Sequence, residues 1–508
     1  MTIGPDTANA FGTEHLQTDL RGRSIRGGIL TLTSQGAQFL MQSVATIVLA
    51  RLLVPSDFGL VAMVTAITGL GQSFADLGLS EATIQRPQIE HKQVSTLFWI
   101  NAGIGLGLML ITISLAPALA WFYHEPRLRG IALVSSLTFL VGGLRVQHDA
   151  LLKRQMRYPS IAIRDITAYC TAVPLAIYLA WRGAGYWAIV ALPLTLNVVS
   201  MLFSWGMIRW IPGLPSLGNG ARSMVSFGGK VAASSLLLNA MRNTDNVLVG
   251  WYWGAGPLGL YSRAYNLLLL PVRQLSAPAA GVIVPALSRL QDAPERLARY
   301  YLRGINLIMW ISAPLFGYLF AAATPVIVLT LGNRWREAAP VFQFLAIFAL
   351  GQLLIEATFW LLVSRGESSR LLRITLAMSP VIVVSYAIGL PFGIKGVALA
   401  GSIVQLAIFP AVIKASFRGT SLTLKGLGHA IVWPLFISLL GGATSVVAGE
   451  LLLPKTMASQ LGLPAACFAL SFLVAMFIPA VRNEVKSIAG VVHSSALQRW
   501  AMPTGEVG

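Results

Sequence analysis

Charged and amide side chains interrupt the apolar stretch 231–253 of this chain. Arg242 lies three residues before Asp245 and four before Asn246, so the three side chains share one face of a helix. An arginine in mid-span costs at least about 2.5–3.5 kcal/mol to insert into a bilayer, and it usually faces the protein interior or water. The cluster indicates either a cavity wall, where Arg242 binds an anion and Asp245 holds it or takes a proton, or a structural ion pair between helices.

Two further arginines, Arg263 and Arg273, lie in the next apolar stretch, 258–288. Their separation of ten residues places them about 80° apart around a helix. Arg273 lies near mid-span, follows Pro271 and has no carboxylate within four residues. We expect Arg273 either to bind an anion in a cavity or to pair with a carboxylate of another helix, such as Asp76.

Carboxylates in the second and fourth apolar stretches could couple or gate transport. Asp76 could exchange a proton with the cavity, or it could pair at a helix end with Arg86 or Lys92. Arg145 and Asp149 are spaced i,i+4 at the cytoplasmic end of their stretch, next to a histidine. This spacing favours a gate or a structural pair over direct binding of a substrate.

Fourteen apolar stretches must position these residues. The chain is 55% hydrophobic and 11% charged, whereas soluble domains average about 25% charged residues. Each stretch is close to the roughly 20 residues that cross about 30 Å of hydrocarbon as a helix. The sequence therefore predicts an all-α, polytopic membrane protein. Its expected spans are 28–50, 58–82, 95–122, 130–150, 161–181, 185–208, 231–253, 258–288, 304–331, 338–363, 371–391, 396–413, 428–452 and 461–481.

The distribution of lysine and arginine predicts the topology. With the N-terminus inside, 25 of the 37 cations lie in cytoplasmic segments, eight lie outside and four lie within spans. Cytoplasmic loops of membrane proteins carry this excess, so we expect both termini to be cytoplasmic. The net charge of +18 follows from the same bias and does not indicate nucleic-acid binding. The polar residues 1–27 do not resemble a cleavable signal peptide.

Several kinds of chemistry are not expected. Cys170 and Cys467 both fall inside apolar stretches and are interpreted as small core residues, not as disulfide or metal-binding groups. No G-x-x-x-x-G-K-[ST] stretch is present, and the loops are too short to hold a catalytic domain. We therefore predict a protein without cofactor or metal that is not an enzyme.

Weak internal echoes predict two halves. Gly59-Leu60 recurs as Gly259-Leu260, and two further pairs of segments, Leu151–Arg154 with Leu362–Arg365 and Gly185–Trp187 with Gly396–Ala398, recur at an offset of 211. Parallel repeats of this kind favour a carrier that works around a midplane site. The predicted organisation is a tail 1–27, an N-lobe 28–208, a linker 209–230, a C-lobe 231–413, a helix pair 414–481 and a tail 482–508.

Three motifs carry a specific resemblance. Residues 50–60 read Ala-Arg-Leu-Leu-Val-Pro-Ser-Asp-Phe-Gly-Leu, residues 245–250 read Asp-Asn-Val-Leu-Val-Gly, and residues 259–265 read Gly-Leu-Tyr-Ser-Arg-Ala-Tyr. Over roughly residues 20–420 the chain resembles Wzx-type oligosaccharide flippases of the multidrug/oligosaccharidyl-lipid/polysaccharide (MOP) exporter superfamily. The closer resemblance is to the branch that serves exopolysaccharides such as colanic acid or succinoglycan.

The resemblance implies a fold of two six-helix lobes around a cavity, and a function. A polyprenyl-diphosphate oligosaccharide would be flipped from the inner to the outer leaflet of the bacterial cytoplasmic membrane, for exopolysaccharide or lipopolysaccharide synthesis. The lipid-linked oligosaccharide and membrane lipids would be its partners, with the polymerase and glycosyltransferases of the same pathway. Arg242 and Arg273 would contact the diphosphate, and Asp245, Asn246 and Arg263 would line the cavity.

One departure concerns the first helix. Lipid II flippases of the superfamily carry arginines there, whereas this chain has Gln35, Gln38 and Gln42. Two other functions stay open. A cation-coupled drug exporter of the same superfamily would favour acidic and aromatic cavity groups over several arginines. A polysaccharide polymerase or ligase would favour a larger external loop.

Overall fold

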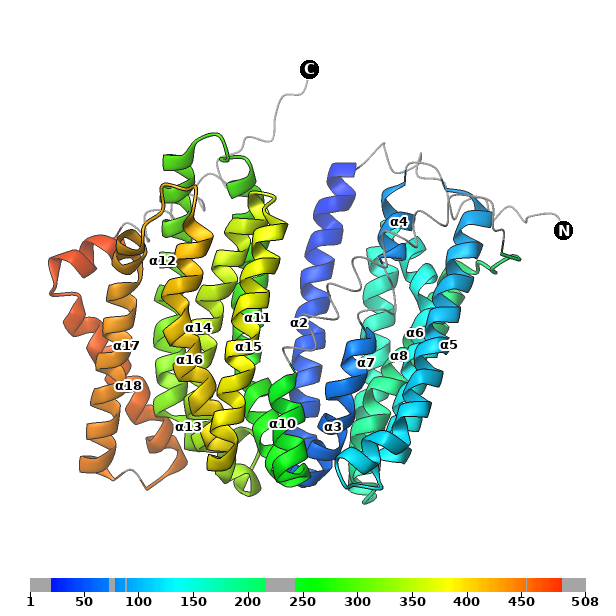
Figure 1. Ribbon diagram of the computed structural model, residues 1–508, viewed down its shortest axis with the longest axis horizontal. Helices are drawn as coiled ribbons and strands as arrows, with labels where there is room; N and C mark the ends of the chain where they lie inside the picture. The colour runs from blue at the N-terminus through cyan, green and yellow to red at the C-terminus, as the bar shows by residue number, and fades with distance from the viewer. Residues whose placement is uncertain (1–19, 73–77, 87–88, 216–242, 454, 487–508) are drawn as a thin grey trace. The chain divides into compact units, whose positions relative to one another are not determined.

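A computed structural model describes residues 20–72, 78–86, 89–215, 243–453 and 455–486, and these residues form helices and connecting turns without any strand (Figure 1). The chain divides into two compact units, unit 1 (Met1–Ser262) and unit 2 (Arg263–Gly508). Ten stretches of described helix are long and apolar enough to cross a membrane. The predictions of an all-α fold and of a polytopic membrane protein are confirmed, and the count of fourteen spans stays a prediction.

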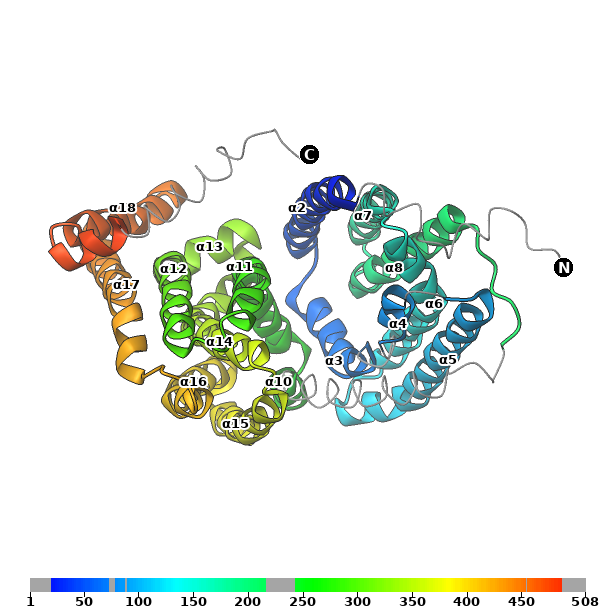
Figure 2. The same ribbon diagram turned by 90° about the horizontal axis from the view of Figure 1, so that it is seen from above.

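Unit 1 contains the helices up to α10 and the first turns of α11 (Figure 2). In chain order these are α2 (Leu20–Leu52), α3 (Pro55–Gln72), α4 (Leu79–Gln85), α5 (His91–Phe122), α6 (Leu128–Arg154), α7 (Tyr158–Trp181), α8 (Tyr186–Ile208), α10 (Thr244–Trp253) and α11 (Ala255–Ser288). The most extensive helix contacts join α5 to α6 and α7 to α8, and α2 packs along α7. These contacts bring α6, α7 and α8 together at the site described below.

Unit 2 contains the remainder of α11 and all later helices. These are α12 (Pro294–Ala321), α13 (Ala323–Thr330), η2 (Asn333–Ala338), α14 (Ala339–Ser364), α15 (Ser368–Gly389), η3 (Leu390–Phe392), α16 (Gly393–Phe417), α17 (Leu424–Leu452) and α18 (Met457–Ala475). Its core lies where α11, α12, α14 and α16 meet, around fully buried side chains such as Met309, Leu361 and Ile413. Figure 2 places α17 and α18 at the edge of this unit.

Most predicted spans correspond to one helix each, and four differ. The predicted span 461–481 extends beyond the end of α18 at Ala475 and across a turn at residues 476–478. The predicted span 58–82 corresponds to α3 and α4, with residues 73–77 outside the described ranges. The span 304–331 is divided at Ala322 into α12 and α13. Only α10 is described within the span 231–253. Because residues 216–242 also lie outside the described ranges, the predicted lobe boundary in the linker 209–230 stays a prediction.

The first pair of predicted repeat segments lies in mutual contact in unit 1. A Cβ atom at Gly59 of α3 would lie 1.7 Å from the carbonyl oxygen of Ala255, and a Cβ atom at Gly259 of α11 would lie 1.8 Å from the carbonyl oxygen of Pro55. Only glycine allows the two backbones to approach so closely. Gly254 has a φ of 79°, a left-handed conformation that glycine adopts without strain, between α10 and α11. We call the reciprocal contact of Gly59 and Gly259 the glycine crossing.

Candidate functional site

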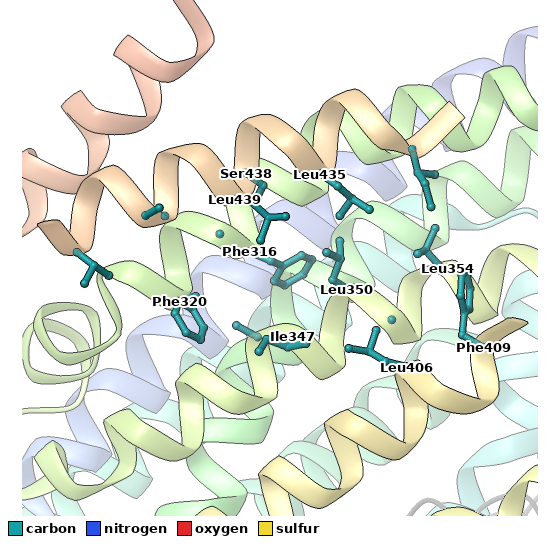
Figure 3. Close-up of a pocket in the computed structure, with 17 residues that line it drawn as sticks. Phe316, Phe320, Ile347, Leu350, Leu354, Leu406, Phe409, Leu435, Ser438 and Leu439 are labelled. Atoms are coloured by element: carbon teal, nitrogen blue, oxygen red, sulfur yellow. The ribbon is translucent and has the colours of Figure 1, made fainter. Parts of the chain in front are cut away.

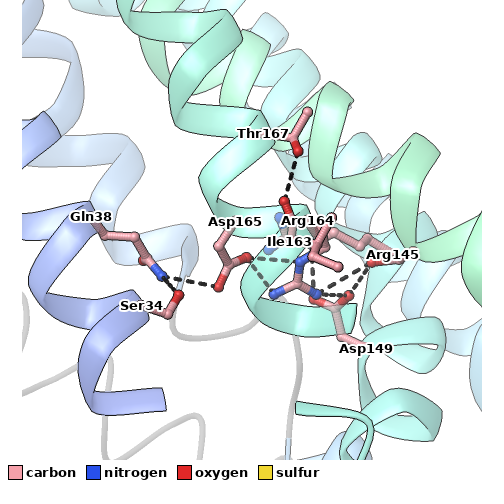
Figure 4. A network of polar contacts seen from close by, with 9 residues as sticks. Ser34, Gln38, Arg145, Asp149, Ile163, Arg164, Asp165 and Thr167 are labelled. Atoms are coloured by element: carbon pink, nitrogen blue, oxygen red, sulfur yellow. Dashed lines mark hydrogen bonds and ion pairs between the residues drawn. The ribbon is translucent and has the colours of Figure 1, made fainter. Parts of the chain in front are cut away.

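A network of charged side chains joins α6, α7 and α8 within unit 1 (Figure 4). The Asp149 carboxylate receives Arg145 Nε at 3.1 Å, Arg164 Nη1 at 2.5 Å and the Ser204 hydroxyl at 2.6 Å. Arg164 also pairs with its neighbour Asp165, at 2.7 Å. Two arginines and two aspartates therefore balance each other in a region where their charges are largely withdrawn from water.

Helix α2 joins the network through an amide. Gln38 donates from Nε2 to Asp165 Oδ2 at 3.3 Å and to the Ser34 hydroxyl at 3.1 Å (Figure 4). Gln38 lies on the first helix, where the family resemblance implies arginines. In this chain the arginine that faces Gln38 across Asp165 comes from α7 instead. The first helix therefore contributes a neutral hydrogen-bond donor to a site whose positive charge is supplied by α6 and α7.

The exposed fractions of the side chains indicate which members of the network a ligand can reach. The side chain of Arg164 is 10% exposed, that of Asp149 is 18% exposed and that of Arg145 is 28% exposed. Arg164 is held by two carboxylates and is interpreted as the structural centre. Arg145 has one carboxylate partner and more exposure, so it is the arginine that can exchange that partner for another anion most readily.

Sequence reasoning found only part of this network. The Arg145–Asp149 ion pair forms as the i,i+4 spacing suggested, and its role in coupling or gating stays a prediction. Arg164 and Asp165 fall at the start of the predicted span 161–181, and neither was among the predicted site residues. Their adjacent opposite charges, 15 residues after Asp149 and beyond the turn between α6 and α7, are the signal that could have indicated a shared network.

Asp245 lies at the contact between α10 and α11. It is 1% exposed, and its carboxylate accepts hydrogen bonds from the Tyr261 hydroxyl at 2.9 Å and from the Asn246 backbone N–H at 2.8 Å. Arg242, its predicted partner, lies outside the described residues. The contacts of Asp245 favour the structural alternative, in which it fastens α11 to α10. A cavity role for Asp245 and Asn246 stays a prediction.

The other predicted residues are separated from this network along the chain. Arg263 is partly buried where unit 2 begins, and Arg273 is exposed on α11. Within unit 2, Arg273 makes no ion pair or hydrogen bond to any described residue. Asp76 lies outside the described ranges. Arg273 thus retains the features of an anion-binding residue, and its assignment stays a prediction.

Comparisons with known proteins agree with the observed fold. A family model with the description "Polysaccharide biosynthesis protein" matches residues 48–340. The lipopolysaccharide biosynthesis protein WzxC of Escherichia coli is 26% identical over 60% of this chain and 62% of its own length. The succinoglycan biosynthesis transport protein ExoT of Rhizobium meliloti is 24% identical over 62% of this chain and 64% of its own length. The chain thus spans a little under two thirds of the length of these relatives.

A solved structure supports the fold over nearly the whole chain. The lipid II flippase MurJ, in an inward closed conformation, aligns with a TM-score of 0.67 over 89% of this chain and 98% of its own length. The sequences are 13% identical, so the likeness concerns the arrangement of helices.

Proposed function

Because this chain belongs to the polysaccharide biosynthesis protein family, we propose that it flips polyprenyl-diphosphate-linked oligosaccharide repeat units across the bacterial cytoplasmic membrane by alternating access. The family match carries the proposal. It is supported by relatives named for lipopolysaccharide and succinoglycan biosynthesis and by the fold of a protein named as a lipid II flippase. The flipped repeat units would be used in exopolysaccharide or lipopolysaccharide synthesis. The polymerase and glycosyltransferases of that pathway would be partners of this protein.

The chemistry of the proposed cargo explains the distribution of charge. A diphosphate that leaves water needs cations in a low-dielectric site, and arginine guanidinium groups supply them in a geometry that matches phosphate oxygens. Arg273, which has no described partner in unit 2, and Arg145, with a single carboxylate partner, are the arginines best suited to this role. Arg242 stays a predicted third contact. The excess of lysine and arginine in the predicted cytoplasmic segments supports an inner-membrane orientation with both termini inside.

Deleting the gene tests the proposal directly. We expect lipid-linked repeat units to accumulate in the inner leaflet and surface polysaccharide to disappear, because no carrier would present the units outside. Leaflet location can be measured by enzymatic release of the sugar from intact and inverted membrane vesicles. Normal surface polysaccharide, with altered drug susceptibility, would support a drug exporter instead. Formation of glycosidic bonds by the purified protein would support an enzyme.

Arg273→Gln should reduce flipping about tenfold or more in liposomes that contain a labelled polyprenyl-diphosphate sugar. A hydrogen bond to a charged group contributes about 1.5–3 kcal/mol, and 1.4 kcal/mol is about tenfold. The melting temperature should not fall, since Arg273 has no described partner within unit 2. Arg273→Lys should restore part of the activity because it keeps the charge.

Arg182→Gln is the matched control, because this exposed arginine ends α7 and lies in a turn. It should flip at the wild-type rate. If Arg273→Gln also flips at the wild-type rate, Arg273 does not belong to the substrate-binding site. The proposed function itself is tested separately, by the deletion experiment.

A further inference from the structure

An elongated cavity of about 650 Å³ lies among α12, α14, α16 and α17 of unit 2 (Figure 3). Its walls are hydrocarbon, from side chains such as Phe316, Leu350, Phe409 and Leu435. The one polar side chain among its lining residues is Ser438, and its hydroxyl already donates to the Ala313 carbonyl oxygen at 2.6 Å. Such a cavity offers no partner to water, and an apolar ligand is the occupant that its chemistry fits.

The cavity opens at an apolar surface of unit 2 and is long enough for an extended chain. Three lining side chains on α16 and α17, Leu406, Leu439 and Val446, are 48%, 72% and 51% exposed. Along α17 the lining runs from Ile431 to Val446, which corresponds to about 22 Å of helix. This exceeds half of the roughly 30 Å hydrocarbon core, so an extended hydrocarbon chain fits along it better than a compact molecule.

The cavity also explains how α17 is held. This helix packs closely on α12 and α18 but only slightly on α16. The space that remains between α17 and the pair α14 and α16 is the cavity itself. Dispersion contacts that a filled interior would provide are missing along this side of α17. A bound chain would supply them.

Positive charge at one end of the cavity favours a ligand with an anionic headgroup. Lys425 precedes Ile431 by six residues on α17, and Lys414 follows Phe409 by five residues on α16. Both lysines are exposed at the same end of the cavity, within about two helical turns of its lining. Their ammonium groups suit the phosphate of a lipid that enters from that leaflet.

Most of the cavity lining lies beyond the residues that the family model matches. The family match ends at residue 340, whereas the lining on α14, α16 and α17 begins at Ala346. A common membrane component is therefore a better occupant than the cargo of the shared function. We propose that this cavity binds an acyl chain of an anionic bilayer phospholipid, which fastens α17 to α14 and α16. The proposal does not depend on the proposed function.

Filling the cavity with a side chain tests the proposal that a phospholipid binds there. Gly442 lines the cavity, and a Cβ atom there would meet nothing within 4 Å. In mixed micelles of phosphatidylglycerol and detergent, native mass spectrometry should show phospholipid on the wild-type protein and about tenfold less on Gly442→Leu. Gly449→Leu is the control, since it has the same open surroundings on α17 but lies outside the lining. It should keep the lipid.

A second pair of measurements identifies the lipid if Gly442→Leu fails to fold. Lys414→Gln with Lys425→Gln should remove the preference for phosphatidylglycerol over phosphatidylcholine, and phosphatidylglycerol should raise the melting temperature of the wild-type protein more than that of this double variant. Equal phospholipid occupancy in the wild-type, Gly442→Leu and Gly449→Leu proteins would overturn the proposal. So would retention of undecaprenyl phosphate in place of phospholipid when both are offered at equal concentration.

Discussion

Asp149→Asn is expected to destabilise the protein by up to about 3–5 kcal/mol, the cost of removing one member of a fully buried ion pair, since Asp149 is 18% exposed. Asp149 is the acceptor that Arg145, Arg164 and Ser204 share, so its neutralisation leaves Arg164 paired with Asp165 alone and removes the carboxylate partner of Arg145. Thermal unfolding of the purified protein in detergent measures the effect. A second change that restores neutrality, Arg145→Gln combined with Asp149→Asn, should recover part of the lost stability.

The exposed pair Glu295–Arg299 provides the control for this variant. Its atoms are 3.9 Å apart and its side chains are 84% and 72% exposed, so Glu295→Gln should cost less than about 1 kcal/mol. Equal melting temperatures for Asp149→Asn and Glu295→Gln would contradict the view that the network holds α6, α7 and α8 together.

Alanine at either glycine of the crossing is expected to lower the free energy of unfolding by more than ordinary overpacking does, which costs about 1–3 kcal/mol. The new methyl group would lie 1.7 Å from the Ala255 oxygen in Gly59→Ala and 1.8 Å from the Pro55 oxygen in Gly259→Ala. Both obstacles are backbone atoms, which cannot rotate away as a side chain can. Yield of folded protein and its melting temperature should fall for both variants, and the proposed flipping activity should be lost.

Gly256→Ala is the matched control, three residues away in α11. A Cβ atom at Gly256 would meet nothing within 4 Å, and alanine favours a helix over glycine by roughly 0.5–1 kcal/mol. The variant should therefore be as stable as the wild-type protein or slightly more stable. Wild-type stability in Gly59→Ala would show that α3 and α11 do not meet as described.

The helices could be predicted from the sequence because their length and apolar composition follow from the thickness of the bilayer. Helices such as α8, expected over 185–208 and observed over Tyr186–Ile208, need no tertiary information. The divisions within predicted spans could not be foreseen in the same way. At Ala322, for example, α12 ends and α13 begins in a largely apolar run; Pro325, three residues later, indicates that a kink could occur but not that the helix is divided at Ala322.

The site was predicted less well, because a charge near a helix end is ambiguous in sequence. Arg164 could extend toward water, and only the approach of α6 brings Asp149 to within 2.5 Å of it. Asp245 was grouped with Arg242 by spacing along one helix. Its observed donor, the Tyr261 hydroxyl, lies 16 residues away on α11, and no local periodicity predicts that bond. Contacts within one helix could be read from spacing, whereas contacts between helices could not.

The glycine crossing places corresponding positions of two repeated segments in mutual contact, as a two-fold axis does with identical subunits of a homodimer. Each glycine faces the carbonyl group that precedes the other glycine by four residues. A larger side chain on one segment cannot be accommodated by a smaller one on the other, because both partners are already glycine and backbone. Each position is therefore restricted to glycine on its own account, and a substitution at one cannot be compensated by a substitution at the other.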